Sequence, residues 1–279
     1  MVVFVSICLT SCSDPFQYTQ LLNIASWNIR YAPELVTNDA PAESFPWSSR
    51  VLGMGKMLAE LDLTILATQE GNKQQLSDLD ETLPNLEMID AHRVWSTTFF
   101  PSLFVNTELV SVVASGDLWL SNQPEVVDSK LSSSAWPRML TWALVEIEGH
   151  NGRWLLINVH LDGTDIEQVE ILHRLVFGLV KTHTPTYTIL CGDFNASLAS
   201  ETTDPAYRSL FSYFQKYKQQ VTYNGHGKAQ SGKDWDIDWI LTSSNLPLSY
   251  QLRRSEHSAL QDLYLSDHDL VRLELAASR

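Results

Sequence analysis

The sequence contains little cysteine: Cys8, Cys12 and Cys191 are the only three among 279 residues. Three cysteines so far apart make no disulfide framework, and no pair has zinc-ligand spacing with a second pair nearby. Cys191 lies within an apolar run, so we expect it to be a buried small side chain. The scarcity of cysteine thus argues against a fold held by disulfide bonds or by a thiolate zinc site.

Basic residues are also scarce, because 19 lysines and arginines stand against 33 acidic residues, a net charge of -14. A protein that coats nucleic acid usually has the opposite balance, since lysine and arginine neutralise the phosphates. A divalent cation in an acidic active site would invert the field only locally, so the charge says little about a nuclease. Hydrophobic residues make up 44% of the chain, which predicts a packed globular core.

Long hydrophobic runs are absent as well, since no segment reaches the ~20 apolar residues of a membrane span. The first twelve residues, MVVFVSICLTSC, form a short apolar run before a small-residue site, which is typical of a secretory signal. The ending LTSC resembles the lipobox of bacterial lipoproteins, in which Cys12 would be lipidated. No positive residue precedes the run, and the alternatives are a short buried strand and a cytoplasmic protein. We expect residues 1–20 to be an export or lipoprotein signal or an N-terminal tail, and residues 21–279 to form one domain.

Strand and helix patterns are interleaved along the chain. β-Branched and aromatic residues predict strands at 21–27, 63–68, 109–115, 117–120, 140–147, 153–161, 186–192, 236–241, 248–253 and 270–275. Apolar residues with a 3.6-residue period predict helices at 165–181 and 48–61, and a third is expected near 205–219. The runs 140–147 and 153–161 are joined by the short EGHNG, which predicts a hairpin. The pattern indicates an α/β (α+β) fold of two packed, mixed sheets with outer helices.

Polar residues recur where these apolar strands end. They are Asn28, Glu70, His160, Asp162, Asp193, Asn195, Asp236, Asp238, Asp267 and His268. Each alone is more often a turn or cap residue than a ligand. Together they offer hard oxygen ligands suited to Mg²⁺, Mn²⁺ or Ca²⁺ and imidazoles that can stabilise phosphate oxygens. Such a set is what hydrolysis of a phosphate ester requires.

Six short motifs strengthen this interpretation. In chain order they are SWNIR (26–30), TQE (68–70), NVHLD (158–162), GDFN (192–195), DWDIDWI (234–240) and SDHDLV (266–271). Their types and order resemble the endonuclease/exonuclease/phosphatase superfamily, which includes deoxyribonuclease I, and most closely a bacterial group of metal-dependent hydrolases. The resemblance implies a four-layered α/β sandwich in which two mixed β-sheets pack face to face between outer helices. It places the active site at one edge of the two sheets.

The resemblance also implies how the cation and the substrate would be held. Asn28 and Glu70 would lie at the metal, with Glu70 as the principal ligand, and Asp267 would lie near it. The expected cofactor is Mg²⁺, or Mn²⁺ or Ca²⁺ in its place. Arg138, just before a predicted strand, would contact the phosphate with two parallel hydrogen bonds.

Five further residues carry the catalytic roles that the resemblance implies. His160 would hydrogen-bond the scissile phosphate, Asp193 would orient or deprotonate the attacking water, and Asn195 would hold the phosphate or that water. Asp238 would pair with His268 and keep its imidazole oriented and charged. Whether Asp162 touches the site is left open.

We therefore expect a divalent-metal-dependent phosphoesterase acting on phosphodiester or phosphomonoester bonds. The alternative is a binding protein that kept the fold and lost the chemistry, although the complete set of residues favours an enzyme. The substrate stays open between nucleic acid, a phospholipid head group and a small phosphodiester or sugar phosphate. The segment 221–238 is expected to be a loop that contacts the substrate, and the protein is expected to be a monomer without an obligate protein partner.

Overall fold

The computed structural model describes most of the chain after the predicted signal. The described residues are 21–37, 44–96, 99–163, 165–197, 204–216, 221–226, 236–246, 249–254, 259–260 and 263–276. The predicted signal or tail with Cys12, residues 217–220 of the third predicted helix, and 227–235 of the predicted loop lie outside these ranges.

Two six-stranded sheets form the centre of the structure. The first sheet has the order β11-β14-β1-β2-β4-β3 and the second β5-β6-β7-β8-β10-β9, while β12 and β13 form a small separate pair. The strands of the first sheet are β1 (Leu22–Asn28), β2 (Ile65–Gly71), β3 (Glu87–Met88), β4 (Phe100–Val105), β11 (Ser249–Arg254) and β14 (Val271–Ala276). Those of the second are β5 (Val110–Trp119), β6 (Met139–Ile147), β7 (Arg153–His160), β8 (Tyr187–Asp193), β9 (Phe214–Gln215) and β10 (Asp238–Ser243), and the small pair is β12 (Ala259–Leu260) and β13 (Leu263–Tyr264). Parallel pairs β1–β2 and β7–β8 occur beside antiparallel pairs, so both sheets are mixed, as predicted.

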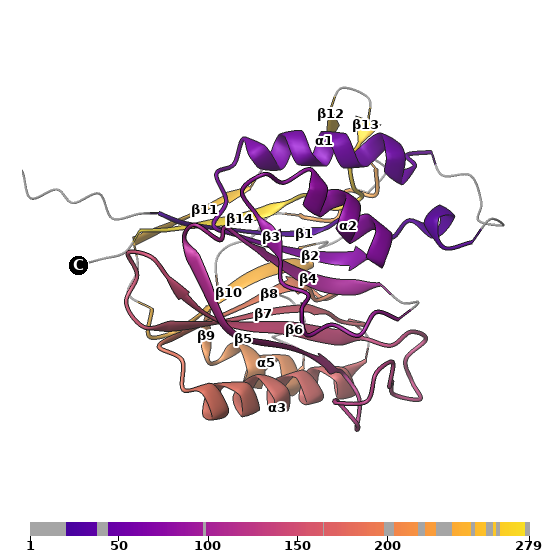
Figure 1. Cartoon of the computed structure of the whole chain (residues 1–279). Helices are drawn as coiled ribbons and strands as arrows, with labels where there is room; N and C mark the ends of the chain where they lie inside the picture. The colour runs from indigo at the N-terminus through magenta and orange to yellow at the C-terminus, as the bar shows by residue number, and fades with distance from the viewer. Residues whose placement is uncertain are drawn as a thin grey trace, which may run out of the picture.

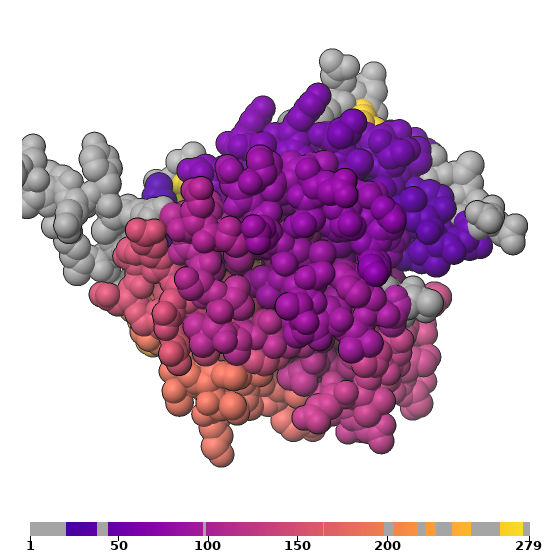
Figure 2. Space-filling view, viewed as in Figure 1, coloured from indigo at the N-terminus to yellow at the C-terminus, as the bar shows by residue number. Residues whose placement is uncertain are grey.

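Helices cover the outer face of each sheet (Figure 1). Helices α1 (Trp47–Ala59) and α2 (Lys73–Glu81) pack on the first sheet, whereas α3 (Ile166–His183) and α5 (Pro205–Phe211) pack on the second. A 3₁₀ turn, η1 (Pro33–Leu35), precedes α1. Figure 2 shows the same stacking, with the segment of α1 and α2 above and that of α3 and α5 below. The four-layered sandwich is confirmed, and no helix among the described residues is long and apolar enough to cross a bilayer.

Some elements differ from the sequence prediction. The two strands predicted at 109–115 and 117–120 are one strand, β5. Gly116 lies between the two predicted runs; a Cβ at this position would lie 2.8 Å from Nε1 of Trp142, so the glycine makes room for the indole. Helix α2 and strand β4 were not predicted. Only Gln75, Leu76 and Leu79 of α2 are buried, so its apolar periodicity is weak. The predicted helix at 205–219 ends at Phe211.

The alternation of side chains along the strands determines what lies between the sheets. In β1, Leu22 and Ile24 belong to the core between the sheets, and Asn28 follows on the same face at the end of the strand. In β8, Ile189 is followed by Cys191 and then Asp193 in the same way. The layer between the sheets is therefore apolar along most of its length and polar at one end.

A buried amide pair joins the two sheets next to this polar end. Gln69 of β2 donates from Nε2 to Oδ1 of Asn158 in β7 at 2.8 Å, and both side chains are fully buried. Asn158 in turn donates from Nδ2 to the backbone oxygens of Thr68 and Ser102, at 2.8 Å each. The pair fixes the relative position of β2 and β7, because each lost bond would leave a buried polar group without a partner.

Cys191 is free and buried, as predicted, and burial raises the pKa of its thiol to about 12. The residue that follows it, Gly192, has φ +136, and a Cβ there would collide with the backbone oxygen of Val159 in the neighbouring strand. The close contact of β7 and β8 thus depends on a glycine at this position.

We predict opposite effects on stability for two glycine-to-alanine substitutions. Gly192→Ala should lower the free energy of unfolding by about 3 kcal/mol or more, because the backbone of β7 must shift and φ is unfavourable. Gly178→Ala is the control: its Cβ would meet nothing within 4 Å on α3, so it should raise stability by about 0.5–1 kcal/mol. Urea unfolding measures both. Equal effects of the two substitutions would contradict this account of Gly192.

Candidate active site

The register of three neighbouring strands brings three predicted residues side by side. His160, the last residue of β7, is paired with Asp193, the last residue of β8. Asp193 is paired in turn with Asp238, the first residue of β10, which runs antiparallel to β8. All three are nearly or fully buried and lie on the face that meets the first sheet. Neighbouring strands lie about 4.8 Å apart, so their side chains form one row.

The first sheet contributes Asn28 and Glu70 from the ends of β1 and β2. Asn28 donates from Nδ2 to Oε1 of Glu70 at 3.0 Å and to Oδ2 of Asp193 at 2.9 Å. Its Oδ1 accepts the backbone N–H of Arg30 at 2.9 Å, which identifies the oxygen side of the amide. Asn28 therefore acts in this arrangement as a donor between two carboxylates, and its role as a metal ligand stays a prediction.

Glu70 is held in an unusual backbone conformation. Its φ of 66 lies in the left-handed region, which a non-glycine residue rarely adopts. The conformation directs the carboxylate toward the second sheet, where Oε1 lies 4.0 Å from Nε2 of His160. Oε2 accepts the backbone N–H of Tyr31 at 2.8 Å. Strain of this kind is a feature of functional sites.

His160 is held as a neutral acceptor. Its Nε2 lies 2.8 Å from Nη1 of Arg138 and 3.2 Å from Nδ2 of Asn195, and both of these atoms are donors. Burial lowers the pKa of His160 well below its ordinary value, and the charges of Arg138 and His268 lower it further. Asn195 also donates to the backbone oxygen of Leu161 at 2.9 Å, so it is fixed beside the imidazole.

His268 has the opposite electrostatic state. Its Nδ1 lies 2.8 Å from Oδ2 of Asp238. Burial alone would lower the pKa of His268, but the charge and hydrogen bond of Asp238, with Asp193 and Asp267, outweigh burial and raise it to about 10. The structure places Asp238 beside His268, and the raised pKa favours the charged imidazole; the catalytic role of the pair stays a prediction. The loop of His268 is tied to β1, because Ser266 donates from Oγ to the backbone oxygen of Asn28 at 2.6 Å.

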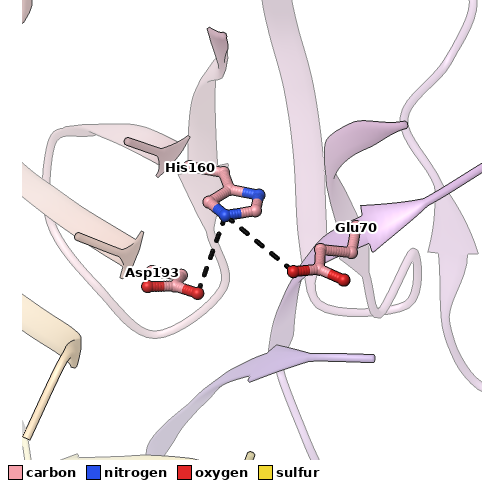
Figure 3. Close-up of side chains that lie close together, drawn as sticks. All are labelled: Glu70, His160 and Asp193. Atoms are coloured by element: carbon pink, nitrogen blue, oxygen red, sulfur yellow. Dashed lines mark ion pairs between the residues drawn. The ribbon is translucent and has the colours of Figure 1, made fainter. Parts of the chain in front are cut away.

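Asp193 lies between the two imidazoles. Its Oδ2 is 3.7 Å from Nε2 of His160 and 3.8 Å from Nε2 of His268. Burial, followed by the charge of Asp238, raises the pKa of Asp193 to about 7. Figure 3 shows how the carboxylates of Asp193 and Glu70 lie on either side of Nε2 of His160. We call Glu70, His160, Asp193, Asp238 and His268 the polar centre.

The polar centre fits a small divalent cation. One ligand atom each from Glu70, His160 and Asp193 lie within 4.8 Å of one another, and so do those of Asp193, Asp238 and His268. The second group is already explained by the pair of Asp238 with charged His268. In the first group, Glu70 and Asp193 are hard oxygen donors, and the raised pKa of Asp193 shows that its negative charge is incompletely balanced. Oδ1 of Asp238 is also buried and has no hydrogen-bond partner among the described residues.

Three acidic residues singled out from the sequence, Asp162, Asp236 and Asp267, are in neither group. Asp267 faces Arg30, with Oδ2 at 3.8 Å from Nη1, and is in neither group of candidate ligands among the described residues. Asp162, left open by the sequence, is half-buried and stabilises the charge of Arg138. Its backbone N–H donates to Oε1 of Gln168 at 3.0 Å. Asp162 therefore belongs to the surroundings of the arginine.

Several residues near the centre were not singled out from the sequence. Gln69 and Asn158 form the amide pair between the sheets, and Tyr223 packs edge-on to His268 with ring centroids 5.1 Å apart. Gln69 and Asn158 lie inside the motifs TQE and NVHLD, so a signal existed. Tyr223 lies in the predicted loop, whose described part, 221–226, is bridged to His268 through Tyr223.

Comparisons with known proteins agree with this geometry. The model of the Endonuclease/Exonuclease/phosphatase family matches residues 25–268. A mannosyl-6-phosphatase from Bacteroides thetaiotaomicron is 25% identical, with a TM-score of 0.73 over 92% of this chain and 100% of that chain. A protein of the same family from Bacteroides vulgatus is 21% identical, with a TM-score of 0.76 over 92% and 99%. TDP2 from D. rerio, complexed with a single-strand DNA product, is 16% identical, with a TM-score of 0.65 over 92% and 99%.

The similarities to the Bacteroides vulgatus protein and to TDP2, at 21% and 16% identity, support the fold alone. A search of curated protein sequences found no match. The family model spans the first five motifs and ends at His268 within the sixth, so it contains the whole polar centre. The chain belongs to the endonuclease/exonuclease/phosphatase family.

Proposed function

We propose that this protein is a divalent-metal-dependent hydrolase of phosphate esters, acting on phosphodiester or phosphomonoester bonds. The observation that carries the proposal is the position of Asp193, whose Oδ2 lies 3.7 and 3.8 Å from a neutral and a charged imidazole. A carboxylate that can take a proton thus lies beside the imidazolium of His268, which can bind a phosphate oxygen. Membership of the family supports the same reaction class.

Glu70 and Asp193, with His160, would hold the cation. Each oxygen of Glu70 accepts a single hydrogen bond from the described residues, which leaves lone pairs for a metal. Mg²⁺ suits these hard oxygen donors best, and Mn²⁺ or Ca²⁺ are the alternatives. When bound, the cation neutralises charge on the phosphate and on the leaving oxygen.

Asp193 is the general base: it orients the attacking water and takes a proton from it. Asn28 and the backbone N–H of Asn195 donate to its two oxygens at 2.9 and 2.8 Å and hold its carboxylate in place. Arg138 and Asn195 bind the phosphate on the side of the second sheet, because Nε2 of His160 is an acceptor and is assigned to the cation. The donors of Arg138 and Asn195, which now meet at Nε2 of His160, can turn to a phosphate oxygen.

His268 supplies fixed positive charge from the other side. Its Nδ1–H is bound to Asp238, so Nε2–H is the proton directed toward the substrate. A preorganised donor of this kind stabilises the charge that develops on phosphate oxygens in the transition state. Asp238 acts through His268, as the partner that keeps it protonated.

We also propose a class of substrate and a location for the protein. The similar mannosyl-6-phosphatase supports a small phosphate ester, and the net charge of -14 disfavours binding of a long polyanion. We propose export, with lipidation at Cys12, from the signal-like sequence of residues 1–12.

Replacement of His268 tests whether the protein is an enzyme or a binding protein on the same fold. His268→Ala should lower kcat/KM for bis(p-nitrophenyl) phosphate or p-nitrophenyl phosphate with Mg²⁺ by about 10³-fold, since it removes the fixed charge. EDTA should abolish the wild-type rate, and added Mg²⁺ should restore it. A wild-type protein without Mg²⁺-dependent hydrolysis, or an unchanged rate in His268→Ala, would refute the mechanism.

The pH profile tests the role of Asp238. Because the protonated form of His268 is the active one and its pKa is about 10, the alkaline limb of wild-type activity should lie near pH 10. Asp238→Asn removes the carboxylate that favours the imidazolium, so the pKa of His268 falls. The alkaline limb of the kcat/KM profile should move down by about 1–3 pH units. An alkaline limb that stays in place would show that another group titrates.

Metal affinity gives a readout that is independent of turnover. Glu70→Gln should weaken Mg²⁺ binding, measured by calorimetry, at least about tenfold, because one charged ligand is lost. Glu146→Gln is the matched control, since Glu146 is exposed, paired with Arg153 and distant from the polar centre. Equal affinity of the Glu70→Gln and wild-type proteins would exclude Glu70 as a ligand.

A further inference from the structure

Arg30, the second residue after β1, has a backbone conformation that is unfavourable for a residue with a side chain. Its φ of 58 lies in the left-handed region, which disfavours a residue with a Cβ. Three side chains fix its backbone. The N–H donates to Asn28 at 2.9 Å, and the oxygen accepts from Nε2 of Gln75 at 2.9 Å and from Nη2 of Arg50 at 3.2 Å. The fold thus stabilises an unfavourable backbone that directs Arg30 toward Asp267.

The guanidinium of Arg30 lies beside the ring of His226 and the carboxylate of Asp267. It contacts Nε2 of the His226 ring, and Nη1 lies 3.8 Å from Oδ2 of Asp267. The side chains of Arg30 and Asp267 are 27% and 19% exposed, so both remain accessible. Because the carboxylate largely balances the guanidinium charge, the pair offers donors and acceptors with little net charge. Such a pair suits neutral hydroxyl groups better than a second phosphate.

Three aromatic rings lie beside this pair. Phe45 stacks on His226, with centroids 5.1 Å apart and planes at 26°, and meets the edge of Tyr264 at 5.7 Å. His226 and Tyr264 are 6.0 Å apart, and all three rings are half-buried. The rings come from three distant segments: the turn before α1, the loop after Tyr223, and β13. We call Phe45, His226 and Tyr264 the ring group.

The ring group is connected to the polar centre through Asp267 and Tyr223. Asp267 directly precedes His268, and Tyr223 packs edge-on against the His268 ring. The other side of the centre has its own arginine, since Arg138 lies over Phe99 at 5.4 Å from the ring centroid. Arg138 contacts His160 and is assigned to the scissile phosphate. The proposed mechanism therefore gives Arg30, on the opposite side, no contact with the scissile phosphate.

We propose that the substrate is a sugar phosphate. Arg30, Asp267 and the ring group would bind its hydroxylated ring, which is the alcohol part of the phosphate ester. The inference rests on the proposed function, because it concerns the same polar centre. Aromatic faces pack against the C–H groups of a sugar ring, while Arg30 and Asp267 exchange hydrogen bonds with its hydroxyls. The rings form one compact patch, whereas a nucleic-acid strand needs stacking platforms for successive bases along a basic groove.

Binding to an inactivated protein tests the inference. Asp193→Asn removes the proposed base but keeps an amide oxygen for the cation. Calorimetry at saturating Mg²⁺ can therefore compare glucose 6-phosphate and mannose 6-phosphate with ethyl phosphate. All three are phosphate monoesters, and ethyl phosphate lacks a ring and free hydroxyls. We expect at least one hexose phosphate to bind about tenfold more tightly than ethyl phosphate, a difference of about 1.4 kcal/mol. Adding Arg30→Ala or Phe45→Ala should remove this preference.

Matched controls separate recognition from folding. Arg153→Ala removes an exposed, carboxylate-paired arginine at the opposite end of β7, and Tyr213→Ala removes an exposed aromatic residue that packs on Phe177 of α3. Both should keep the preference. Phe45→Leu retains apolar volume without the ring face, so it should lose the preference while the thermal unfolding midpoint is retained.

The outcomes distinguish the two proposals. Equal binding of the hexose phosphates and ethyl phosphate, or a preference that survives in all the variants, would overturn the inference. A single-stranded oligonucleotide that binds more tightly than the sugars and depends on Phe45 would overturn it as well. If wild-type protein with Mg²⁺ hydrolyses no phosphate ester, the proposed function fails, and the binding preference alone decides the inference.

Discussion

The burial of Asp193 is the interaction on which the surrounding structure depends. A carboxylate removed from water costs several kcal/mol unless it is paired and hydrogen-bonded. Asp193 is 1% exposed, and its partners are the amide of Asn28, a backbone N–H and the charged imidazole of His268. These partners come from both sheets. The sheets must therefore pack in one relative position, and the amide pair of Gln69 and Asn158 holds them there.

Much of this arrangement could be predicted from the sequence, because each strand is an apolar run that ends in a polar residue. The end of β8 at Asp193 and that of β7 at His160 follow from the alternation of side chains together with the motifs GDFN and NVHLD. The class of two packed, mixed sheets followed from the interleaved strand and helix patterns, and the four layers from the motif order. Strand ends are easier to predict than helices such as α2, in which buried leucines are few.

Atomic roles could not be predicted in the same way. The motif SWNIR identifies Asn28, but only the backbone N–H of Arg30 determines which end of its amide faces the carboxylates. The motif SDH identifies Asp267 beside His268, yet its carboxylate faces Arg30, a residue from the other end of the chain. Such choices depend on contacts between residues far apart in sequence. The unfavourable backbone angles of Arg30, Glu70 and Asn195 depend on tertiary contacts in the same way.

The tie between the first strand and the last motif has a consequence for synthesis. Trp27 of β1 donates from Nε1 to the backbone oxygen of His268 at 3.0 Å, and β14, which follows His268, pairs with β1. During translation, β1 leaves the ribosome early but lacks its neighbour β14 until the last described strand of the domain is made. A nascent chain therefore contains Glu70, His160 and Asp193 without the charged imidazole. The polar centre is completed only when the two ends of the domain meet, so the proposed hydrolytic activity would arise at the last step of folding.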